Sequence, residues 1–351
     1  MEVQLNLLNP ERVENHLESV PDKAPPSITF VTCLEAGPLE QQVIRMVTSL
    51  RKWGGRFANA AVYAVNPRFD ILKINPSTFR SLEELGVEYI SIRPKNSFPW
   101  YRFLNKPVSV AAVESRVSTE FICFLDGDIL VIREPWQLDL GTEFDFAACV
   151  RDKGGIGTTG SGDPNERNWE LMCQALDMNI EDLPLVTSLY FEERIRLYFN
   201  SGVLVYRRST KLGIKWHDDC LRLLKAQIAH PQHNIYFFDQ AALSLSVARH
   251  GLRIRQLDYS HNHGLGKLHL HSHLKDQLGK ACILHYHEAM SPDHWNEFLE
   301  FVAVASPETA DWLRPLGPII NKTSLRRSLR DALRSLRYLQ QLAHVRKCRT
   351  V

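Results

Sequence analysis

Two carboxylates separated by one residue follow an apolar run in the first half of the chain. The run Phe121–Leu125 reads FICFL, and Asp126, Gly127 and Asp128 come directly after it. A buried strand of this kind ends at the edge of an α/β sheet where ligands bind. Aspartate oxygens are hard ligands that suit Mg²⁺ or Mn²⁺, usually together with substrate phosphates. The pattern predicts a divalent-metal site that neutralises a phosphate-bearing group, although two turn or capping aspartates would read the same way.

Polar residues open two further apolar segments. Asn200 and Gly202 begin a strand-like run, where the amide offers both a donor and an acceptor and the glycine permits close backbone approach. Asp239 and Gln240 fall in the first turn of a predicted helix over Phe238–Arg249, near the positive end of its dipole. Taken alone, Asp239 fits an ordinary helix cap equally well. These two segments strengthen the interpretation of the Asp-x-Asp segment as a site of chemistry.

Histidines are concentrated in one segment of the last third of the chain. Eight of the fourteen lie between His261 and His294, and three alternate along the chain. On a strand, the alternating set would face one side and could bind zinc or nickel. The competing interpretation is a solvated, histidine-rich loop edge beside the site. The eight are His261, His263, His269, His271, His273, His285, His287 and His294.

The elements that must position these side chains alternate between two periodicities. Short apolar runs read as strands, and segments with apolar residues three or four apart read as helices. This alternation predicts an α/β fold whose sheet is mostly parallel and flanked by helices on both faces. In chain order the predicted elements are Ile28–Cys33, Pro38–Trp53 (helix), Ala60–Val65, Ser77–Leu85 (helix), Glu88–Ile92, Tyr101–Ser115 (helix) and Phe121–Leu125.

The pattern becomes less regular after Asp126. Arg151–Asn165 is rich in Gly, Thr, Ser and Asp and predicts a long mobile loop, interpreted either as a lid over an acceptor or as plain disorder. The predicted strands here are Ile129–Ile132, Phe144–Val150, Phe199–Tyr206, Leu252–Leu257 and Cys282–Tyr286. The predicted helices are Trp169–Leu176, Phe191–Tyr198, Lys211–Ile228, Phe238–Arg249 and His294–Ala303.

The chain of 351 residues is long for one domain, and it predicts a leader over 1–26, one domain over 27–315 and a tail over 316–351. Seven dispersed cysteines without a CxxC pair indicate reduced thiols in a cytosolic compartment. The N-terminus lacks the pattern of a signal peptide, and no run is long enough to span a bilayer. The expected location is cytoplasmic.

Charge is unevenly distributed. Residues 322–351 hold nine Lys or Arg and one acidic residue, a net of +8, so the remaining residues carry −6 of the overall +2. A mildly acidic body argues against nucleic acid as its partner. In the tail, leucines recur every three or four residues from Leu325 to Leu339 with arginines between them. Such a helix could lie on an anionic membrane as a peripheral anchor, pack on the body or mediate self-association.

The ordered motifs LDGDILV, YFNSGVLVY, FDQAALSL, LDYSHN and ILHYH carry a family resemblance. Over about residues 28–300 the chain resembles the nucleotide-diphospho-sugar transferases of GT-A fold. It is similar in particular to glycosyltransferase family 8, which includes glycogenin and bacterial lipopolysaccharide galactosyl- and glucosyltransferases. The resemblance implies a single GT-A (Rossmann-like) domain with a mixed, mostly parallel sheet. It also implies sugar transfer from a nucleotide-diphosphate donor, such as a UDP-sugar, to a glycan, lipid or protein acceptor.

The resemblance assigns roles residue by residue. Asp126, Asp128 and His285 match the positions that bind Mn²⁺ or Mg²⁺ in the family. The family usually continues from His-Tyr with Gly and then Lys-Pro-Trp, whose lysine contacts the diphosphate. Here Trp295 is present but the lysine is not, so either His287 or another basic residue substitutes for it, or donor binding differs.

The other matched positions surround the expected donor, and two of them lie at the reaction centre, where one would stabilise a developing cation if configuration is retained. They are Thr32, Cys33 and Glu35 at the base and ribose, Arg102 and Lys106 facing the donor, Gly127, Asn200 and Gly202 beside it, and Asp239 and Gln240 at the reaction centre.

Two alternatives remain from the sequence. Haloacid-dehalogenase-type phosphatases also place Asp-x-Asp after a hydrophobic strand, but early in the chain and with Thr or Val where Leu130 stands. The other alternative is a non-catalytic protein that binds a sugar nucleotide, supported only by the absent lysine.

Overall fold

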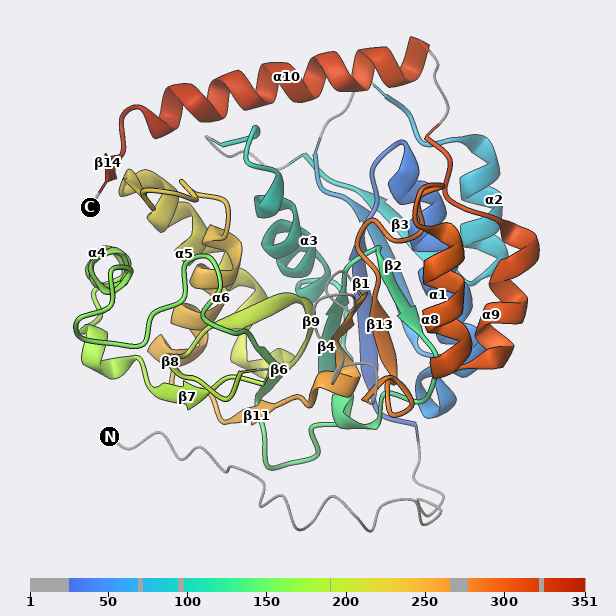
Figure 1. Ribbon diagram of the computed structural model, residues 1–351, viewed down its shortest axis with the longest axis horizontal. Helices are drawn as coiled ribbons and strands as arrows, with labels where there is room; N and C mark the ends of the chain where they lie inside the picture. The colour runs from blue at the N-terminus through green and yellow to red at the C-terminus, as the bar shows by residue number, and fades with distance from the viewer. Residues whose placement is uncertain are drawn as a thin grey trace.

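A seven-stranded mixed sheet forms the centre of the molecule (Figure 1). The computed structural model describes residues 25–68, 72–93, 98–189, 191–265, 277–321 and 325–350. The strand order is β11-β6-β9-β4-β1-β2-β3. All neighbours are parallel except β9, which runs antiparallel to both β4 and β6. The strands are β1 Ile28–Cys33, β2 Ala61–Asn66, β3 Val87–Ser91, β4 Phe121–Leu125, β6 Phe146–Val150, β9 Phe199–Arg207 and β11 Ile254–Gln256.

Helices cover both faces of this sheet. One apolar cluster packs β1, β4, β6 and β9 against α3, α5 and α6, and a second packs the opposite face against α1 and α2. All five residues of β4 are buried, as expected for a strand that is covered on both sides. The predicted α/β class with a mostly parallel central sheet is confirmed. The helices are α1 Pro38–Trp53, α2 Pro76–Glu84, α3 Asn105–Glu114, α4 Glu166–Ala175, α5 Leu212–Lys225, α6 Phe238–Arg249, α8 Trp295–Ala305, α9 Pro307–Leu313 and α10 Leu325–Val345.

A small second sheet joins the end of the body to the Asp-x-Asp segment. Its order is β12-β13-β5, with β5 at Ile129–Val131, β12 at His263–Gly264 and β13 at Ile283–His285. Strands β13 and β5 are antiparallel, and His285 pairs with Ile129. This pairing brings the ILHYH motif next to Asp128, although more than 150 residues separate them in the chain.

Several predicted elements differ from the structure. The predicted helix over Phe191–Tyr198 is wrong, because Arg194–Arg196 forms strand β8, antiparallel to β7 at Leu185–Thr187. Ile195 is buried, and the buried Arg196 pairs with Glu166, so tertiary contacts override the local pattern. The single helix predicted over residues 101–115 is a 3₁₀ turn, Arg102–Leu104, followed by α3.

The segment Arg151–Asn165 is a loop, as predicted, but its centre is anchored to the body. Ile156 and Thr158 are buried. The Trp169 indole N–H donates to the Ile156 carbonyl at 2.6 Å, and the Arg196 backbone N–H donates to the Thr158 carbonyl at 2.8 Å. Its role as a lid stays a prediction. The predicted leader, apart from Pro25 and Pro26, lies outside the described residues, as do His269, His271 and His273.

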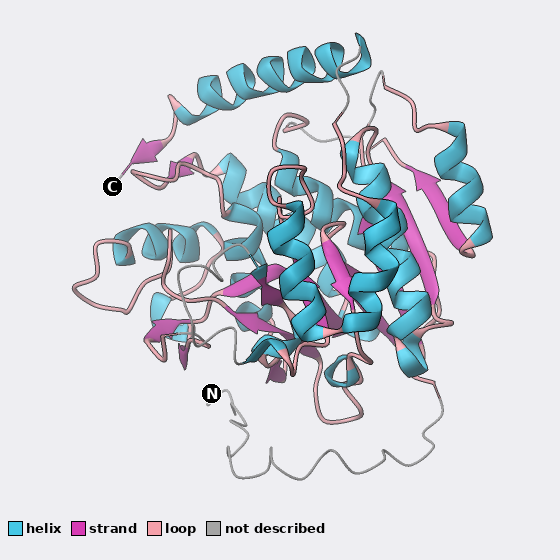
Figure 2. Ribbon diagram, turned by 45° about the vertical axis from the view of Figure 1, so that its right-hand side comes forward, coloured by secondary structure: helices cyan, strands magenta, loops and turns pink. Residues whose placement is uncertain are grey.

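Helix α10 lies across the edge of the molecule to which the carboxyl ends of β1 and β2 point (Figures 1 and 2). Leu333 and Arg337 of α10 line a cavity together with Pro67 and Arg68, which follow β2. After α10, β14 at Arg349–Thr350 pairs with β10 at Ile228–Ala229. Within the described residues, no helix is long and apolar enough to cross a membrane. The seven cysteines, all described, form no disulfide.

Candidate active site

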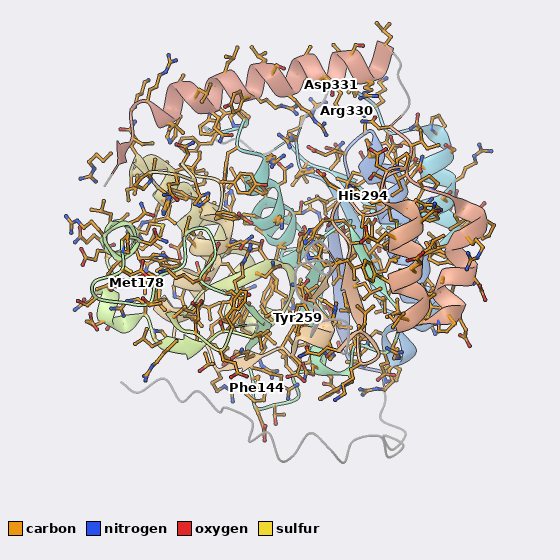
Figure 3. The ribbon with its side chains drawn as sticks, in the orientation of Figure 1. Phe144, Met178, Tyr259, His294, Arg330 and Asp331 are labelled. Carbon is orange, nitrogen blue, oxygen red and sulfur yellow. The ribbon has the colours of Figure 1, made fainter. Side chains whose placement is uncertain are left out.

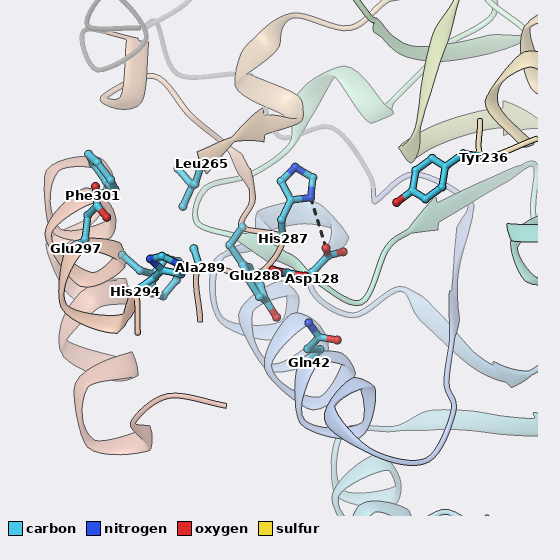
Figure 4. Close-up of a pocket in the computed structure, with 12 residues that line it drawn as sticks. Gln42, Asp128, Tyr236, Leu265, His287, Glu288, Ala289, His294, Glu297 and Phe301 are labelled. Atoms are coloured by element: carbon cyan, nitrogen blue, oxygen red, sulfur yellow. Dashed lines mark ion pairs between the residues drawn. The ribbon is translucent and has the colours of Figure 1, made fainter. Parts of the chain in front are cut away.

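One carboxylate and two imidazoles converge just beyond β4. Asp128 Oδ1 lies 3.4 Å from His285 Nε2. Asp128 Oδ2 lies 3.6 Å from His287 Nδ1 (Figure 4). One ligand atom from each residue lies within 4.8 Å of the others. Asp128 and His287 border a cavity of about 900 Å³, which Gln42 and Tyr236 also line. The three residues can hold a metal ion that faces this cavity.

Local backbone structure explains how these side chains meet. The Asp126 N–H donates to the Gly202 carbonyl at 2.8 Å, which fixes the turn after β4 to strand β9. The Tyr286 N–H donates to the Asp128 carbonyl at 3.0 Å, which ties that turn to β13. His287 has φ of 50°, a left-handed conformation that non-glycine residues seldom adopt. Such backbone strain is typical of functional sites.

The electrostatics of the cluster suit metal binding. Burial alone would raise the pKa of the Asp128 carboxyl, but the facing imidazoles of His285 and His287 hold it well below its usual range. The neighbouring His285 and burial lower the pKa of His287, so that its imidazole is neutral near pH 7. An ionised carboxylate and a neutral imidazole are the forms that bind metals.

An asparagine pair orients His285 from behind. His285 Nδ1 lies 2.9 Å from Asn262 Oδ1, so the imidazole Nδ1–H donates to that oxygen and Nε2 is the ring nitrogen that faces Asp128. Asn262 Nδ2 in turn donates to Asn200 Oδ1 at 3.0 Å. A Cβ at Gly202 would lie 2.6 Å from His285 Cε1, so only glycine fits there without displacing the imidazole.

The first carboxylate of the motif has a different partner. Lys106 Nζ lies 2.7 Å from Asp126 Oδ2 and 3.1 Å from the Ser201 hydroxyl. Burial alone would lower the pKa of Lys106, but Asp126 and Asp239 raise it, so the ammonium is retained. Of the three predicted metal ligands, Asp128 and His285 therefore come together, and Asp126 pairs with Lys106 instead. His287, predicted at the diphosphate, lies with Asp128 and His285.

Asp239 is buried behind this pair. The Ser201 hydroxyl donates to Asp239 Oδ2 at 2.7 Å, and burial raises the pKa of the carboxyl. Among the described residues, neither Asp239 Oδ1 nor the buried Tyr198 hydroxyl has a hydrogen-bond partner. Unpartnered buried oxygens are costly, so they point to a polar ligand group.

Arg151 and Gln240 lie beside these oxygens. The Arg151 guanidinium donates to Gln240 Oε1 at 3.1 Å and lies 5.9 Å from the Tyr198 ring centre. Sequence reasoning missed Tyr198, Arg151 and Asn262. Tyr198 and Asn262 lie within motifs that carry the family resemblance, and Arg151 directly follows a predicted strand. These positions in the sequence could have marked the three residues as candidates for the site.

The residues predicted to hold the base and ribose lie at the end of β1. Glu35 pairs with Arg68, whose Nη2 lies 3.1 Å from Glu35 Oε2, and it also accepts from Asn105 at 3.3 Å. The Thr32 hydroxyl is buried without a partner among the described residues. Burial raises the pKa of the Cys33 thiol to about 12, which leaves it unreactive at neutral pH.

Two remaining predicted residues lie near the cavity and the turn. The Arg102 guanidinium donates to the hydroxyl of Tyr236, which lines the cavity, at 3.1 Å. Gly127 packs closely against α1, because a Cβ there would lie 2.5 Å from Leu39 Cδ1.

The described histidines outside this cluster include two core residues. His261 is fully buried, and its Nε2 accepts from the Gln137 backbone N–H at 3.2 Å. His263 is also fully buried, and its ring packs at a tilt against Tyr259, which Figure 3 labels, with ring centres 4.3 Å apart. The single cluster of potential ligands within the described residues is the Asp128 group. The alternating histidines that could bind zinc or nickel, His269, His271 and His273, lie outside the described residues.

Solved structures with a similar arrangement include two glycosyltransferases. The WbbM bifunctional glycosyltransferase is 16% identical, with a TM-score of 0.49 over 81% of this chain and 50% of that chain. GlyE of Streptococcus pneumoniae TIGR4 is 16% identical, with a TM-score of 0.45 over 86% of this chain and 66% of that chain. The chain thus spans half of the former and about two thirds of the latter. No curated protein sequence is significantly similar to the chain.

A protein-family model gives the decisive comparison. The model of the Rhodobacterales glycosyltransferase domain matches residues 30–251, which is more than half of the chain. The match includes most of β1, β4 with the Asp-x-Asp turn, β9 and α6, and it ends before Asn262, His285 and His287. The chain therefore belongs to the Rhodobacterales glycosyltransferase domain family.

Proposed function

We propose that this glycosyltransferase uses a nucleotide-diphosphate sugar, of the UDP-sugar class, as donor and a divalent metal bound by Asp128, His285 and His287. The observation that carries the proposal is the convergence of three ligand atoms within 4.8 Å beside the large cavity. A glycosyltransferase breaks the bond between a sugar and its leaving group. If the leaving group is a nucleoside diphosphate, a metal ion can neutralise the charge that develops on it. The order of the motifs also supports a GT-A fold that resembles glycosyltransferase family 8.

The chemistry of the donor set favours Mn²⁺ over Mg²⁺. Mg²⁺ strongly prefers oxygen ligands, whereas two imidazoles and one carboxylate suit a transition metal. The residues fit such an ion, because the carboxylate is ionised and the Asn262 hydrogen bond leaves His285 Nε2 available. When bound, the metal would act as a Lewis acid towards the diphosphate.

The protein groups around this position have separable tasks. Lys106 is retained as an ammonium beside Asp126. It can supply the positive charge that a lysine after the His-Tyr motif supplies in glycosyltransferase family 8. Asp239 Oδ1 and the Tyr198 hydroxyl can accept or donate hydrogen bonds to sugar hydroxyls. Arg151 orients Gln240, so that the amide is fixed at the reaction centre.

Ligand-induced stabilisation tests the proposal. Thermal unfolding should be measured with a panel of nucleotide-sugars, each with Mn²⁺, with Mg²⁺ and with EDTA. A ligand that binds the folded state raises the unfolding temperature by mass action. We expect one nucleotide-sugar to stabilise the wild type with Mn²⁺, and Asp128→Asn to lose that shift. Equal stabilisation in EDTA and in Asp128→Asn would refute metal-dependent donor binding. Binding without turnover for any acceptor would instead indicate the non-catalytic alternative.

A further inference from the structure

Helix α10 turns its apolar stripe to solvent. Leu325 and Leu339 are 87% and 61% exposed, and Leu336 is 56% exposed. Residues three, four and seven apart lie on one side of a helix, so the exposed apolar residues form one continuous stripe. We call this set the outer stripe; it comprises Leu325, Leu329, Ala332, Leu336, Leu339 and Ala343.

The opposite side of α10 is fixed to the body by polar and aromatic contacts. Arg330 donates to Asn321 Oδ1, and its guanidinium lies against Gly37 at the start of α1. Figure 3 shows Arg330 on the side of α10 nearer the body. Near the other end, the His344 ring lies 5.0 Å from the Trp100 ring and 5.5 Å from the Phe98 ring. These contacts define which side faces outward.

This orientation is the reverse of an ordinary surface helix. A surface helix in water normally buries its apolar side against the core and exposes its charged side. Here several arginines face the body while leucines face out, which costs free energy in water unless the stripe has a partner. The stripe runs along 21 helical residues, or about 30 Å of helix.

We propose that the outer stripe of α10 docks on the surface of an anionic lipid bilayer. Interfacial helices insert an apolar side of this kind into the boundary between headgroups and acyl chains. Charge supports this occupant, since residues 322–351 carry a net +8. Arg346, Lys347 and Arg349 are exposed at the end of the helix. Basic residues next to such a stripe are attracted to anionic headgroups. The same net charge opposes face-to-face pairing of two copies.

Docking in this way would orient the catalytic body. Helix α10 lies at the edge of the sheet where β1, β2 and β4 end, the edge that carries the candidate site (Figure 1). The bilayer would therefore lie beside that edge. The docking surface itself does not depend on the proposed donor or metal.

The test is vesicle binding by the full chain without donor or metal. Cosedimentation should be compared for vesicles of phosphatidylcholine alone and of phosphatidylcholine mixed with phosphatidylglycerol. The wild type should bind the anionic vesicles, and added salt should weaken binding. Leu325→Gln combined with Leu339→Gln should reduce partitioning on the order of a hundredfold, since burial of each leucine contributes about tenfold or more.

The chain provides a matched control on the same helix. Tyr338 is 57% exposed but lies to one side of the outer stripe, so Tyr338→Gln should bind vesicles like the wild type. Glutamine keeps high helix propensity, and far-ultraviolet circular dichroism should match for all variants. Ala332→Glu, which adds a charge within the stripe, provides a second test and should also weaken binding. The proposal is overturned by no wild-type binding to anionic vesicles, by equal losses in the control, or by a dimer in analytical ultracentrifugation that the leucine variant dissociates.

Discussion

Asn262 offers the sharpest test of how the metal cluster is built. Its side-chain oxygen accepts the His285 Nδ1 proton at 2.9 Å, and its amide donates to Asn200 Oδ1 at 3.0 Å. Replacing it by alanine removes the hydrogen bond that orients the imidazole, so Nε2 is no longer held towards Asp128. Partners that orient a ligating histidine are typically worth 10–100-fold in metal affinity. We expect Asn262→Ala to weaken Mn²⁺ binding by about that factor, or roughly 1.4–2.8 kcal/mol.

Isothermal titration calorimetry with Mn²⁺ measures this effect directly. Asn262→Asp is the matched control, because a carboxylate still accepts the His285 proton and should keep most of the affinity. Thermal unfolding without metal separates loss of the site from loss of the fold. The reasoning is refuted if Asn262→Ala binds Mn²⁺ as tightly as the wild type. It is also refuted if both substitutions weaken binding equally while the fold is intact.

Three further predictions concern packing, the reaction centre and pH. Gly202→Ala should weaken Mn²⁺ binding at least about tenfold, because its Cβ would overlap a metal-binding imidazole, whereas Gly279→Ala, with open space around it, should not change the affinity. Arg151→Ala should lower kcat by about 10–100-fold, in line with loss of a charge-assisted hydrogen bond to Gln240, and leave Mn²⁺ affinity unchanged by calorimetry. Burial lowers the pKa of His261 from its ordinary 6.5 to about 3. Between these two pH values the unfolded state binds a proton that the folded state does not, so the free energy of unfolding decreases as the pH falls from 6.5 towards 3. Between pH 6.5 and 4.5 the loss is about 2–3 kcal/mol, and His261→Gln should show a shallower decline in urea unfolding; parallel curves for the two proteins would contradict this.

The central sheet could be predicted because local sequence patterns identify its strands. The fully buried strand β4 reads as an unbroken apolar run, and polar residues follow it where the strand ends. Alternation of such runs with helical periodicity indicates a parallel sheet. Asp128, His285 and Asp239 could be singled out because they stand at strand ends or in the first turn of a helix.

The partners within the site were less predictable, because they depend on long-range geometry. Lys106 and Asp126 were both expected near the donor, but their pairing depends on how α3 packs beside β4. His287 reaches Asp128 through a left-handed backbone conformation that no residue pattern indicates. Asn262 is 62 residues from Asn200, so its hydrogen bond arises only from tertiary structure. Likewise, Arg196 forms part of a strand because its guanidinium has a buried carboxylate to pair with.

Metal-dependent turnover of a nucleotide-sugar tests the central proposal most directly. The measurement is the rate of nucleoside-diphosphate release by the wild type from the donor that gives the largest thermal shift. It should be made after removal of metal with EDTA and again after addition of Mn²⁺. We expect release only with the metal, restoration by Mn²⁺ in preference to Mg²⁺, and loss on the order of a hundredfold or more in Asp128→Asn. Release that continues undiminished in EDTA and in Asp128→Asn would contradict the account.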